Sequence, residues 1–354
     1  MSAPLVIASE RKLAQVARVA EVSSILVPNS DPPEYASNVV LVRLEDPTWQ
    51  CVALKVDGHQ VGDLVIYFAI DSVLDNTNPA FHHLKGKRLK TVKMLGQLSQ
   101  GLIAPLDSCA YYGLDPYTLE VGQDLTQALK VEKYAFKGDE VGEPHLPPGV
   151  RKTHENRVQE CKGLLRELAR AETEVIATRK EDGTSTSFVF TQGEYYVCGH
   201  RTTRVESEKQ VSHYFEISKR FQVESKLRAL GRNLAVQGEI VGVKINGNTL
   251  KFPKGTPNDF RVFYIWDIDS QRKLSYNETD RLCRGWGFNR PPIVYRGRFK
   301  KEWENVEELL KYVETLEYAE GVPAEGMVVS TDGEGVPQQS FKVISNKWLL
   351  ATGR

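Results

Sequence analysis

Residues 178–188 read TRKEDGTSTSF and contain the tetrapeptide KEDG at positions 180–183. An earlier stretch, ALKVDGHQVGDL at 53–64, contains KVDG at positions 55–58. Both follow the pattern lysine, any residue, aspartate, glycine. The pattern alone does not distinguish a reactive lysine from an ordinary turn residue, so the segments downstream of each copy must decide between them.

The composition is that of an ordinary globular protein. The chain has 354 residues, of which 41% are apolar and 26% are charged, and this length accommodates two domains of usual size. It carries 46 basic and 46 acidic side chains, for a net charge of zero. Because the whole molecule exerts no general attraction on a polyanion, any binding of nucleic acid must depend on a local basic patch.

Neither a membrane segment nor a cysteine framework is indicated. No run of about 18 apolar residues occurs, and Glu10, Arg11 and Lys12 fall where the apolar core of a signal peptide would continue. We therefore expect a soluble, intracellular protein with no membrane partner. The five cysteines are scattered, without a Cys-x-x-Cys pair, which argues against structural zinc and disulfides and favours buried thiols.

The chain divides near residues 138–152, GDEVGEPHLPPGVRK, where glycine, proline and charge replace apolar periodicity. The preceding residues read as short strands separated by turns, as in LAQVARVAEV, NVVLVRLED, WQCVALK and DLVIYFAI. We predict an OB-like β-barrel at 1–140, a linker at 141–152 and a second domain at 153–354.

The second domain is predicted to be of the α+β class, with mixed antiparallel sheets and helices. Helical periodicity is present at 156–171, 214–230 and 303–316. Strands are predicted in EVIAT, TSFVF, EYYVCG, LAVQGEIVGV, FRVFYIWDI, GMVVS and SFKVI.

A lysine that attacks a nucleotide phosphorus needs companions from other strands. Cations and metal ions must neutralise phosphate charge, carboxylates must hold the metal, and an aromatic face can bind a base. Such groups follow Lys180 as separate short motifs: Arg201, Glu239 in QGEIVG, Phe263 in FYIWDI, Glu325 in AEGMVV and Lys342 in SFKVI. Lys55 lacks this series, and Asp57-Gly58 reads as a hairpin turn between the strands at 49–55 and 63–70.

These motifs, in this order and approximate spacing, resemble those of the covalent nucleotidyltransferases, which comprise DNA ligases, RNA ligases and mRNA capping enzymes. The combination is most similar to ATP-dependent RNA ligases of the Deinococcus/Naegleria type. WQCVALK, VGDLVIYFAIDSVL and KGKRLKTVKMLGQLSQGLIAPL resemble the OB module that precedes the catalytic domain in those enzymes. DNA ligases and capping enzymes usually place that module after the catalytic domain.

The resemblance implies an ATP-dependent RNA ligase that acts in RNA repair or nick sealing. Lys180 would attack the α-phosphorus of ATP and carry AMP. The AMP would pass to an RNA 5′-phosphate, and a 3′-hydroxyl would then attack that activated end. The expected partner is RNA with 3′-hydroxyl and 5′-phosphate ends, in a nicked duplex, and no obligate protein partner is implied.

The resemblance also implies a role for each site residue. Asp182 and Gly183 would shape the turn after the nucleophile. Arg201 and Glu239 would contact the ribose or the nucleic-acid end, and Phe263 would stack on adenine. Glu325 and Glu239 would bind Mg²⁺ or Mn²⁺. Lys342 would contact the α-phosphate and lower the pKa of Lys180.

Three positions leave alternatives open. Some relatives carry a second lysine at the position of Ile344; either Lys347 takes over its role as a nucleotide contact or the role is absent. Arg201 competes with Arg204 in GHRTTRV. Arg179, next to the nucleophile, either tunes it or faces solvent.

A basic segment in the first half could contact RNA phosphates or be a solvated surface. It contributes Lys85, Lys87, Arg88, Lys90 and Lys93. The rival functions are a DNA ligase or another covalent nucleotidyltransferase, and a non-catalytic nucleic-acid-binding protein of the same fold.

Overall fold

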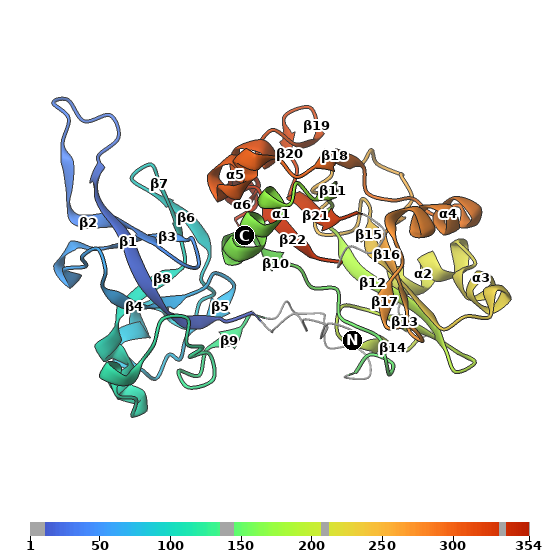
Figure 1. Cartoon of the computed structure of the whole chain (residues 1–354), viewed down its shortest axis with the longest axis horizontal. Coiled ribbons are helices and arrows are strands. Elements are labelled where there is room, and N and C mark those ends of the chain that lie inside the picture. Colours follow the sequence, from blue (N-terminus) through green and yellow to red (C-terminus); the bar gives the residue numbers. More distant parts are fainter. Residues whose placement is uncertain (1–10, 135–144, 207–211, 333–337, 354) are drawn as a thin grey trace. The chain divides into compact units, whose positions relative to one another are not determined.

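The computed structural model describes residues 11–134, 145–206, 212–332 and 338–353, and these form two compact units (Figure 1). The first unit contains the described residues of 1–135, 156–166 and 346–354, and the second those of 136–155 and 167–345. This division differs from the predicted boundaries. The described part of the predicted linker belongs to the second unit, whereas two later segments return to the first.

The first unit is built on a five-stranded antiparallel sheet in the order β3-β2-β1-β4-β8. Its strands are β1 (Ala14–Leu26), β2 (Tyr35–Leu44), β3 (Gln50–Leu54), β4 (Leu64–Phe68) and β8 (Leu102–Pro105). The N-terminal part of β1 pairs with β4 and its C-terminal part pairs with β2, with register shifts at Val19/Glu21 and Ser24/Leu26. Such irregularities bend a strand, so β1 can serve both halves of a curved sheet.

Both faces of this sheet are buried, by clusters that include Ile66 and Phe68 on one side and Val65 and Tyr67 on the other. Shorter elements complete the unit: η1 (Lys55–Asp57), β5 (Ser72–Val73), η2 (Pro79–Leu84), β6 (Thr91–Met94), β7 (Gln97–Gln100), η3 (Leu106–Tyr112), η4 (Pro116–Thr118) and β9 (Glu132–Lys133). The hairpin predicted at Asp57-Gly58 is wrong, because β2 and β1 lie between β3 and β4.

Buried arginines attach residues 156–166 to the first unit. This segment contains β10 (Asn156–Arg157), η5 (Val158–Glu160) and the start of α1 (Lys162–Arg170). Arg157 lies 3.5 Å from Asp71, and Arg11 lies 3.3 Å from Glu160. The helix predicted over 156–171 therefore begins six residues later than its periodicity indicates. The C-terminal helix α6 (Asn346–Thr352) also joins this unit, where Gln100 donates a hydrogen bond to Asn346 (3.0 Å).

The second unit contains two antiparallel sheets. Four strands of one lie in the order β22-β21-β11-β18; they are β11 (Glu174–Lys180), β18 (Ile293–Arg298), β21 (Gly326–Thr331) and β22 (Ser340–Ile344). The other has the order β14-β13-β12-β15-β16-β17, with β12 (Thr184–Thr191), β13 (Glu194–Cys198), β14 (Thr203–Arg204), β15 (Leu234–Val241), β16 (Asp259–Asp267) and β17 (Arg272–Lys273). The chain crosses from the first sheet to the second in residues 181–183.

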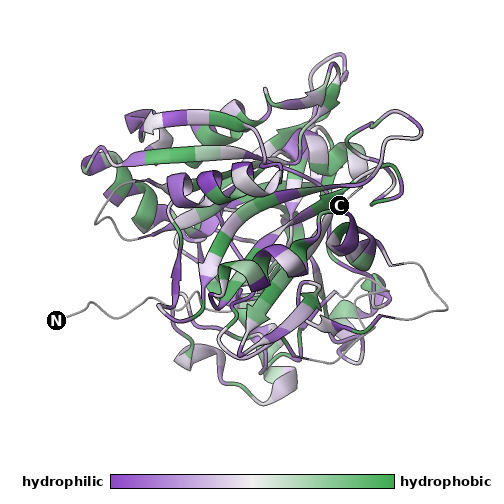
Figure 2. Ribbon diagram, turned by 90° about the vertical axis from the view of Figure 1, so that its right-hand side faces the viewer, coloured by the Kyte–Doolittle hydropathy of each residue, from purple (hydrophilic) through white to green (hydrophobic). Residues whose placement is uncertain are grey.

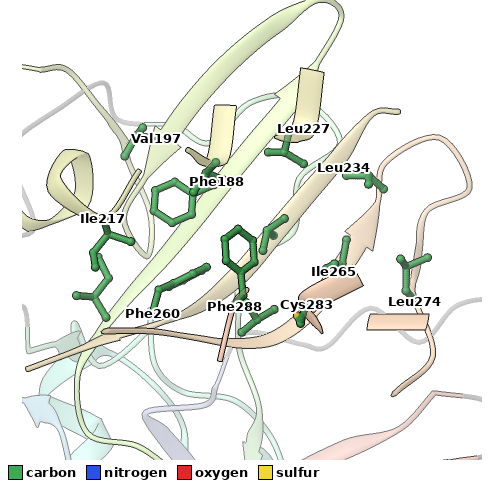
Figure 3. Close-up of a cluster of buried hydrophobic side chains, with 14 of the residues drawn as sticks. Phe188, Val197, Ile217, Leu227, Leu234, Phe260, Ile265, Leu274, Cys283 and Phe288 are labelled. Carbon is green, nitrogen blue, oxygen red and sulfur yellow. The ribbon is translucent and has the colours of Figure 1, made fainter. Parts of the chain in front are cut away.

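Helices cover one face of the six-stranded sheet: α2 (His213–Arg220), α3 (Val223–Leu230) and α4 (Tyr276–Trp286). The aromatic centre of this core is drawn in Figure 3, where Phe188 and Phe260 meet edge to face with ring centroids 4.9 Å apart. The helix predicted over 214–230 is two helices, because Gln222 adopts a left-handed conformation (φ 51°) between them. Figure 2 colours each residue by its hydropathy and shows hydrophobic and hydrophilic residues in both the strands and the helices.

The remaining elements of the second unit are η6 (Lys301–Glu304), α5 (Val306–Val313), β19 (Glu317–Ala319) and β20 (Val322–Pro323). α5 begins later than the predicted helix at 303–316, because Asn305 caps it by accepting a hydrogen bond from the Glu307 amide. The α+β prediction is confirmed. All five cysteines lie in described segments, and all are buried and outside any disulfide. No helix in the described ranges is long and apolar enough to cross a membrane.

Candidate active site

The turn at Lys180–Gly183 lies where the two sheets of the second unit meet. Lys180 ends β11 in one sheet, and Thr184 begins β12 in the other. A Cβ on Gly183 would lie 2.3 Å from the Ile240 carbonyl oxygen and 2.6 Å from Cγ of Glu239. Only glycine permits this approach, which brings the turn directly against β15.

The Lys180 side chain is paired with a carboxylate. Its Nζ lies 2.8 Å from Oε1 of Glu325, and the two side chains are 26% and 12% exposed. Lys180 is directly opposite Gly326 in the β11–β21 pairing, so Glu325 immediately precedes that position. A Cβ on Gly326 would lie 2.0 Å from the Val343 carbonyl oxygen, which shows that the glycine beside Glu325 is also required for close packing.

The local charges raise the pKa of Lys180. Burial opposes the ammonium form, but the carboxylates of Glu325 and Glu239 favour it and together outweigh burial. The prediction that neighbouring cations lower this pKa is therefore not supported, because the pKa is raised. Here the lysine is an ammonium held by carboxylates.

Glu239 faces the same place from the second sheet. It is a buried residue of β15, opposite Ser185 on one side and Arg261 on the other. Burial raises its pKa to about 8; Lys180 acts against the rise, and the negative charges of Glu325 and Asp182 add to it. Acidic groups from both sheets therefore surround one lysine amine.

Phe263 is the extra residue of a β-bulge. Gln237 of β15 pairs with Tyr264 of β16, but its neighbour Gly238 pairs with Val262, so Phe263 has no direct partner. It is half-buried, whereas Val262 and Ile265 belong to the main hydrophobic core. Bulges re-aim side chains next to functional sites. This bulge takes Phe263 out of the regular alternation of side chains between the two faces of the sheet.

Lys342 shares a sheet face with Lys180. Across the three strands, one row of paired residues is Lys180, Gly326 and Ile344. Two residues away along each strand, another row is Thr178, Val328 and Lys342. Directly paired residues, and residues two apart on one strand, point to the same face. Ile344 is buried at the position where some relatives have a second lysine.

The other predicted contacts are distributed as follows. Arg201 is exposed in the turn between β13 and β14, whereas Arg204 is half-buried, with its guanidinium 4.7 Å from the Tyr214 ring centroid. Lys347 is exposed on α6, which belongs to the first unit and not to the sheet that carries Lys180. The structure therefore does not bring Lys347 onto the Lys180 sheet.

The basic segment of the first unit contains one residue unlike the others. Lys85, Lys87, Lys90 and Lys93 are exposed. The Arg88 side chain is only 8% exposed; its Nε lies 3.2 Å from Asp71, and its guanidinium is 5.2 Å from the Tyr134 ring centroid. Arg88 therefore holds the first unit together, and the prediction that it lies on the binding surface is not supported by its burial.

The sequence did not identify Tyr318, Asn246, Glu181 or Arg261 as neighbours of the Lys180 turn. Tyr318 and Asn246 hydrogen-bond the turn: the Tyr318 hydroxyl accepts from the Asp182 amide (2.9 Å), and the Asn246 side chain donates to Oδ1 of Asp182 (3.0 Å). Glu181 is fully buried and lies 2.8 Å from Arg179 and 3.2 Å from Arg261. Arg179 is thus engaged in the turn and does not simply face solvent.

The donor set suits a divalent cation that binds mainly to substrate. Among the described residues no group of three or more histidine, cysteine or acidic side chains could hold a metal by itself. Mg²⁺ typically binds one or two carboxylates together with substrate phosphates and retains several waters. Glu325 and Glu239 are carboxylates of this kind, so the residues present fit such an ion.

The comparisons agree with this geometry in both halves of the chain. A family model described as RNA ligase matches residues 173–344, and a model of an OB-fold domain matches residues 13–106. No curated protein matches the chain.

Solved structures of Naegleria gruberi RNA ligase match nearly the whole chain. Its complex with PPi has a TM-score of 0.80 and 28% identity, covering 96% of this chain and 98% of that chain. A lysine-to-methionine mutant with AMP and Mn gives the same values. A lysine-to-alanine mutant with ATP and Mn has a TM-score of 0.80 and 28% identity over 97% of this chain and 98% of that chain. The predicted OB-like module and adenylylation fold are confirmed, and the chain carries an RNA ligase domain over residues 173–344.

Proposed function

We propose that this RNA ligase uses ATP to join a 3′-hydroxyl RNA end to a 5′-phosphate end, sealing nicks in duplex RNA as a repair reaction. The observation that carries the proposal is the position of Lys180. Its amine lies 2.8 Å from Glu325 at the crossing of two sheets, with Glu239 as a second acidic neighbour. The match to Naegleria gruberi RNA ligase structures containing ATP or AMP and Mn supports the same reading.

Lys180 is the proposed nucleophile. An ammonium has no lone pair, so the amine must release a proton before it can attack. The new bond joins Nζ to the α-phosphorus of ATP, and the bond from that phosphorus to the bridging oxygen breaks as pyrophosphate leaves. AMP then passes to the RNA 5′-phosphate, and a 3′-hydroxyl displaces it to form the phosphodiester.

The surrounding residues support this role through position and charge. We assign Phe263 to adenine stacking, because the bulge leaves its ring outside the main core. We assign Lys342 to the α-phosphate, because it shares a sheet face with Lys180. Arg201, exposed after β13, and Glu239 are assigned to the ribose or the RNA end.

Glu325 and Glu239 are the residues proposed to hold Mg²⁺ or Mn²⁺. When bound, the metal would neutralise charge on the phosphates. A cation beside these carboxylates would also weaken their hold on the Lys180 ammonium, which opposes the rise in its pKa.

The RNA surface is proposed to include Lys85, Lys87, Lys90 and Lys93 of the first unit, which are exposed. Arg88 is excluded because Asp71 engages it. In a chain with zero net charge, such a local cluster supplies the attraction to phosphates that the whole molecule lacks.

Incubation with α-labelled ATP and MgCl₂ or MnCl₂, followed by a denaturing gel, tests the proposal. Pre-bound AMP is first discharged with pyrophosphate. Nicked duplexes with RNA or DNA on either side of the nick then test strand selectivity. A labelled protein that seals RNA nicks supports the proposal, and one that seals only DNA nicks favours a DNA ligase. A protein that takes up no label is a non-catalytic binding protein.

A further inference from the structure

Tyr318 of β19 contacts the Lys180 turn through a single oxygen atom. Its hydroxyl donates a hydrogen bond to the Lys180 carbonyl oxygen (2.7 Å) and accepts one from the Asp182 amide (2.9 Å). These two backbone groups flank Glu181, which is fully buried. One side chain therefore fixes the backbone on both sides of the residue that follows the nucleophile.

The ring of Tyr318 is itself held in place by the turn. The Arg179 guanidinium lies 5.1 Å from the ring centroid. Arg179 also donates to the Glu317 carbonyl (2.9 Å) and to Oε1 of Glu181 (2.8 Å). The contact is thus reciprocal: β19 positions the turn, and the turn positions β19.

The same hydroxyl adjoins the residue that pairs with the nucleophile. Burial raises the pKa of Tyr318, the Glu325 carboxylate adds to the rise, and a hydrogen bond with the Glu325 backbone opposes it. The hydroxyl therefore remains protonated, and it can donate and accept at once.

We propose that Tyr318 is a positioning residue for Lys180. By fixing the backbone on either side of Glu181, its hydroxyl sets the direction in which the Lys180 amine leaves β11. This assignment rests on the proposed function, since it concerns the attack of Lys180 on the nucleotide. Tyr318 thereby has an assigned role, although it lies outside every motif found in the sequence.

The assignment predicts that the steps of the reaction respond differently. Formation of the lysine–AMP bond depends on the placement of Nζ, because small errors in the position of a reacting atom reduce rates severely. Attack of a 3′-hydroxyl on an end that already carries AMP does not use Lys180 as a nucleophile. A residue that only stabilised the fold would affect both steps together.

The test compares Tyr318→Phe with the matched control Tyr312→Phe. Phenylalanine keeps the ring beside Arg179 and removes only the hydroxyl. Tyr312 is likewise half-buried, and its hydroxyl donates to the Val294 carbonyl (2.7 Å), away from the Lys180 turn. Single-turnover labelling is measured over a range of ATP concentrations, and sealing is measured separately on pre-adenylylated nicked RNA.

We expect Tyr318→Phe to lower the maximal labelling rate by about 10- to 100-fold. The ATP concentration at half-maximal rate should stay within about twofold, because binding contacts are retained. Sealing of pre-adenylylated RNA should stay within about threefold of wild type, and Tyr312→Phe should match wild type in both assays.

Several outcomes would overturn the assignment. These are labelling of Tyr318→Phe at the wild-type rate, an equal loss of both steps together with thermal stability, and the same defect in Tyr312→Phe. Each would remove a specific role for this hydroxyl while leaving the ligase proposal intact. An unlabelled wild-type protein would instead overturn the proposed function, and the assignment with it.

Discussion

The two copies of the Lys-x-Asp-Gly pattern adopt different structures. In the first, Lys55–Asp57 form a short 3₁₀ turn that ends at Gly58 with φ 66°, and Val56 is 86% exposed. In the second, Lys180 ends a central strand, and Glu181 at the variable position is fully buried. The same four-residue pattern therefore describes a surface turn in one unit and the crossing between two sheets in the other.

The glycines show why the copies differ. A Cβ on Gly58 would meet nothing within 4 Å, so this glycine is needed only for its left-handed backbone. Gly183 has no left-handed φ but would place a Cβ 2.3 Å from the Ile240 carbonyl oxygen. The pattern marks an active site only where a second strand supplies Glu239 against the turn.

The largest expected effect separates the two lysines. Lys180→Ala should abolish labelling by α-labelled ATP, because it removes the amine that lies 2.8 Å from Glu325 at the crossing of the two sheets. Lys55→Ala should label as wild type, because Lys55 is exposed on the first unit. Denaturing gels of the three proteins measure the difference. Label that disappears only in Lys55→Ala would reverse the assignment of the nucleophile.

The next comparison exchanges the two glycines for alanine. In Gly183→Ala the new methyl group meets a backbone oxygen, so we expect a stability loss of about 2–3 kcal/mol and a labelling rate at least about 100-fold lower. Gly58→Ala should cost about 1 kcal/mol through its positive φ and leave labelling unchanged. Urea denaturation and labelling measure the two effects. Equal losses of activity would show that close approach to β15 is not what matters.

The motifs could be predicted from sequence because each one lies in or next to a separate strand and supplies one polar side chain. Such motifs are visible in the sequence as short patterns in a fixed order. Lys180, Glu239 and Glu325 were identified in this way, and the structure brings them together. The positions of Tyr318 and Asn246 could not be predicted, because their contacts to the turn span 136 and 64 residues and leave no local pattern. The missed helix α4 did carry a local signal, the capping box of Ser275 and Glu278.

The third test changes the residue at the variable position of the Lys-x-Asp-Gly pattern. Glu181→Gln keeps the shape of the side chain but removes the carboxylate that lies between Arg179 and Arg261. We expect a stability loss of about 2 kcal/mol, because two largely buried guanidinium groups lose a charged partner. Val56→Ala, the matching change in the first copy, should stay within about 0.5 kcal/mol.

Urea denaturation of both variants measures these changes. A double-mutant cycle with Arg179→Met then isolates the pair, since removing Arg179 should make the effect of Glu181→Gln smaller. If Glu181→Gln proved as mild as Val56→Ala, the buried ion pairs would contribute nothing to the difference between the two copies.

The final comparison concerns pH. Burial raises the pKa of Glu239 from its ordinary value of 4.5 to about 8, so folding favours the protonated form. The resulting stability is fully present below about pH 4.5 and is lost as pH rises through about 8. From pH 5 to pH 8, wild type should therefore lose about 1–3 kcal/mol more than Glu239→Gln, in which the group cannot ionise.

Urea denaturation of both proteins at each pH measures this difference, because effects of all other groups largely cancel. Magnesium sharpens the comparison: a cation that binds the ionised carboxylate should reduce the wild-type loss and leave Glu239→Gln unchanged. Parallel pH dependence in the two proteins would mean that Glu239 is solvated and does not share the acidic environment of Lys180. The pairing of Lys180 with Glu325 would then stand without a contribution from Glu239.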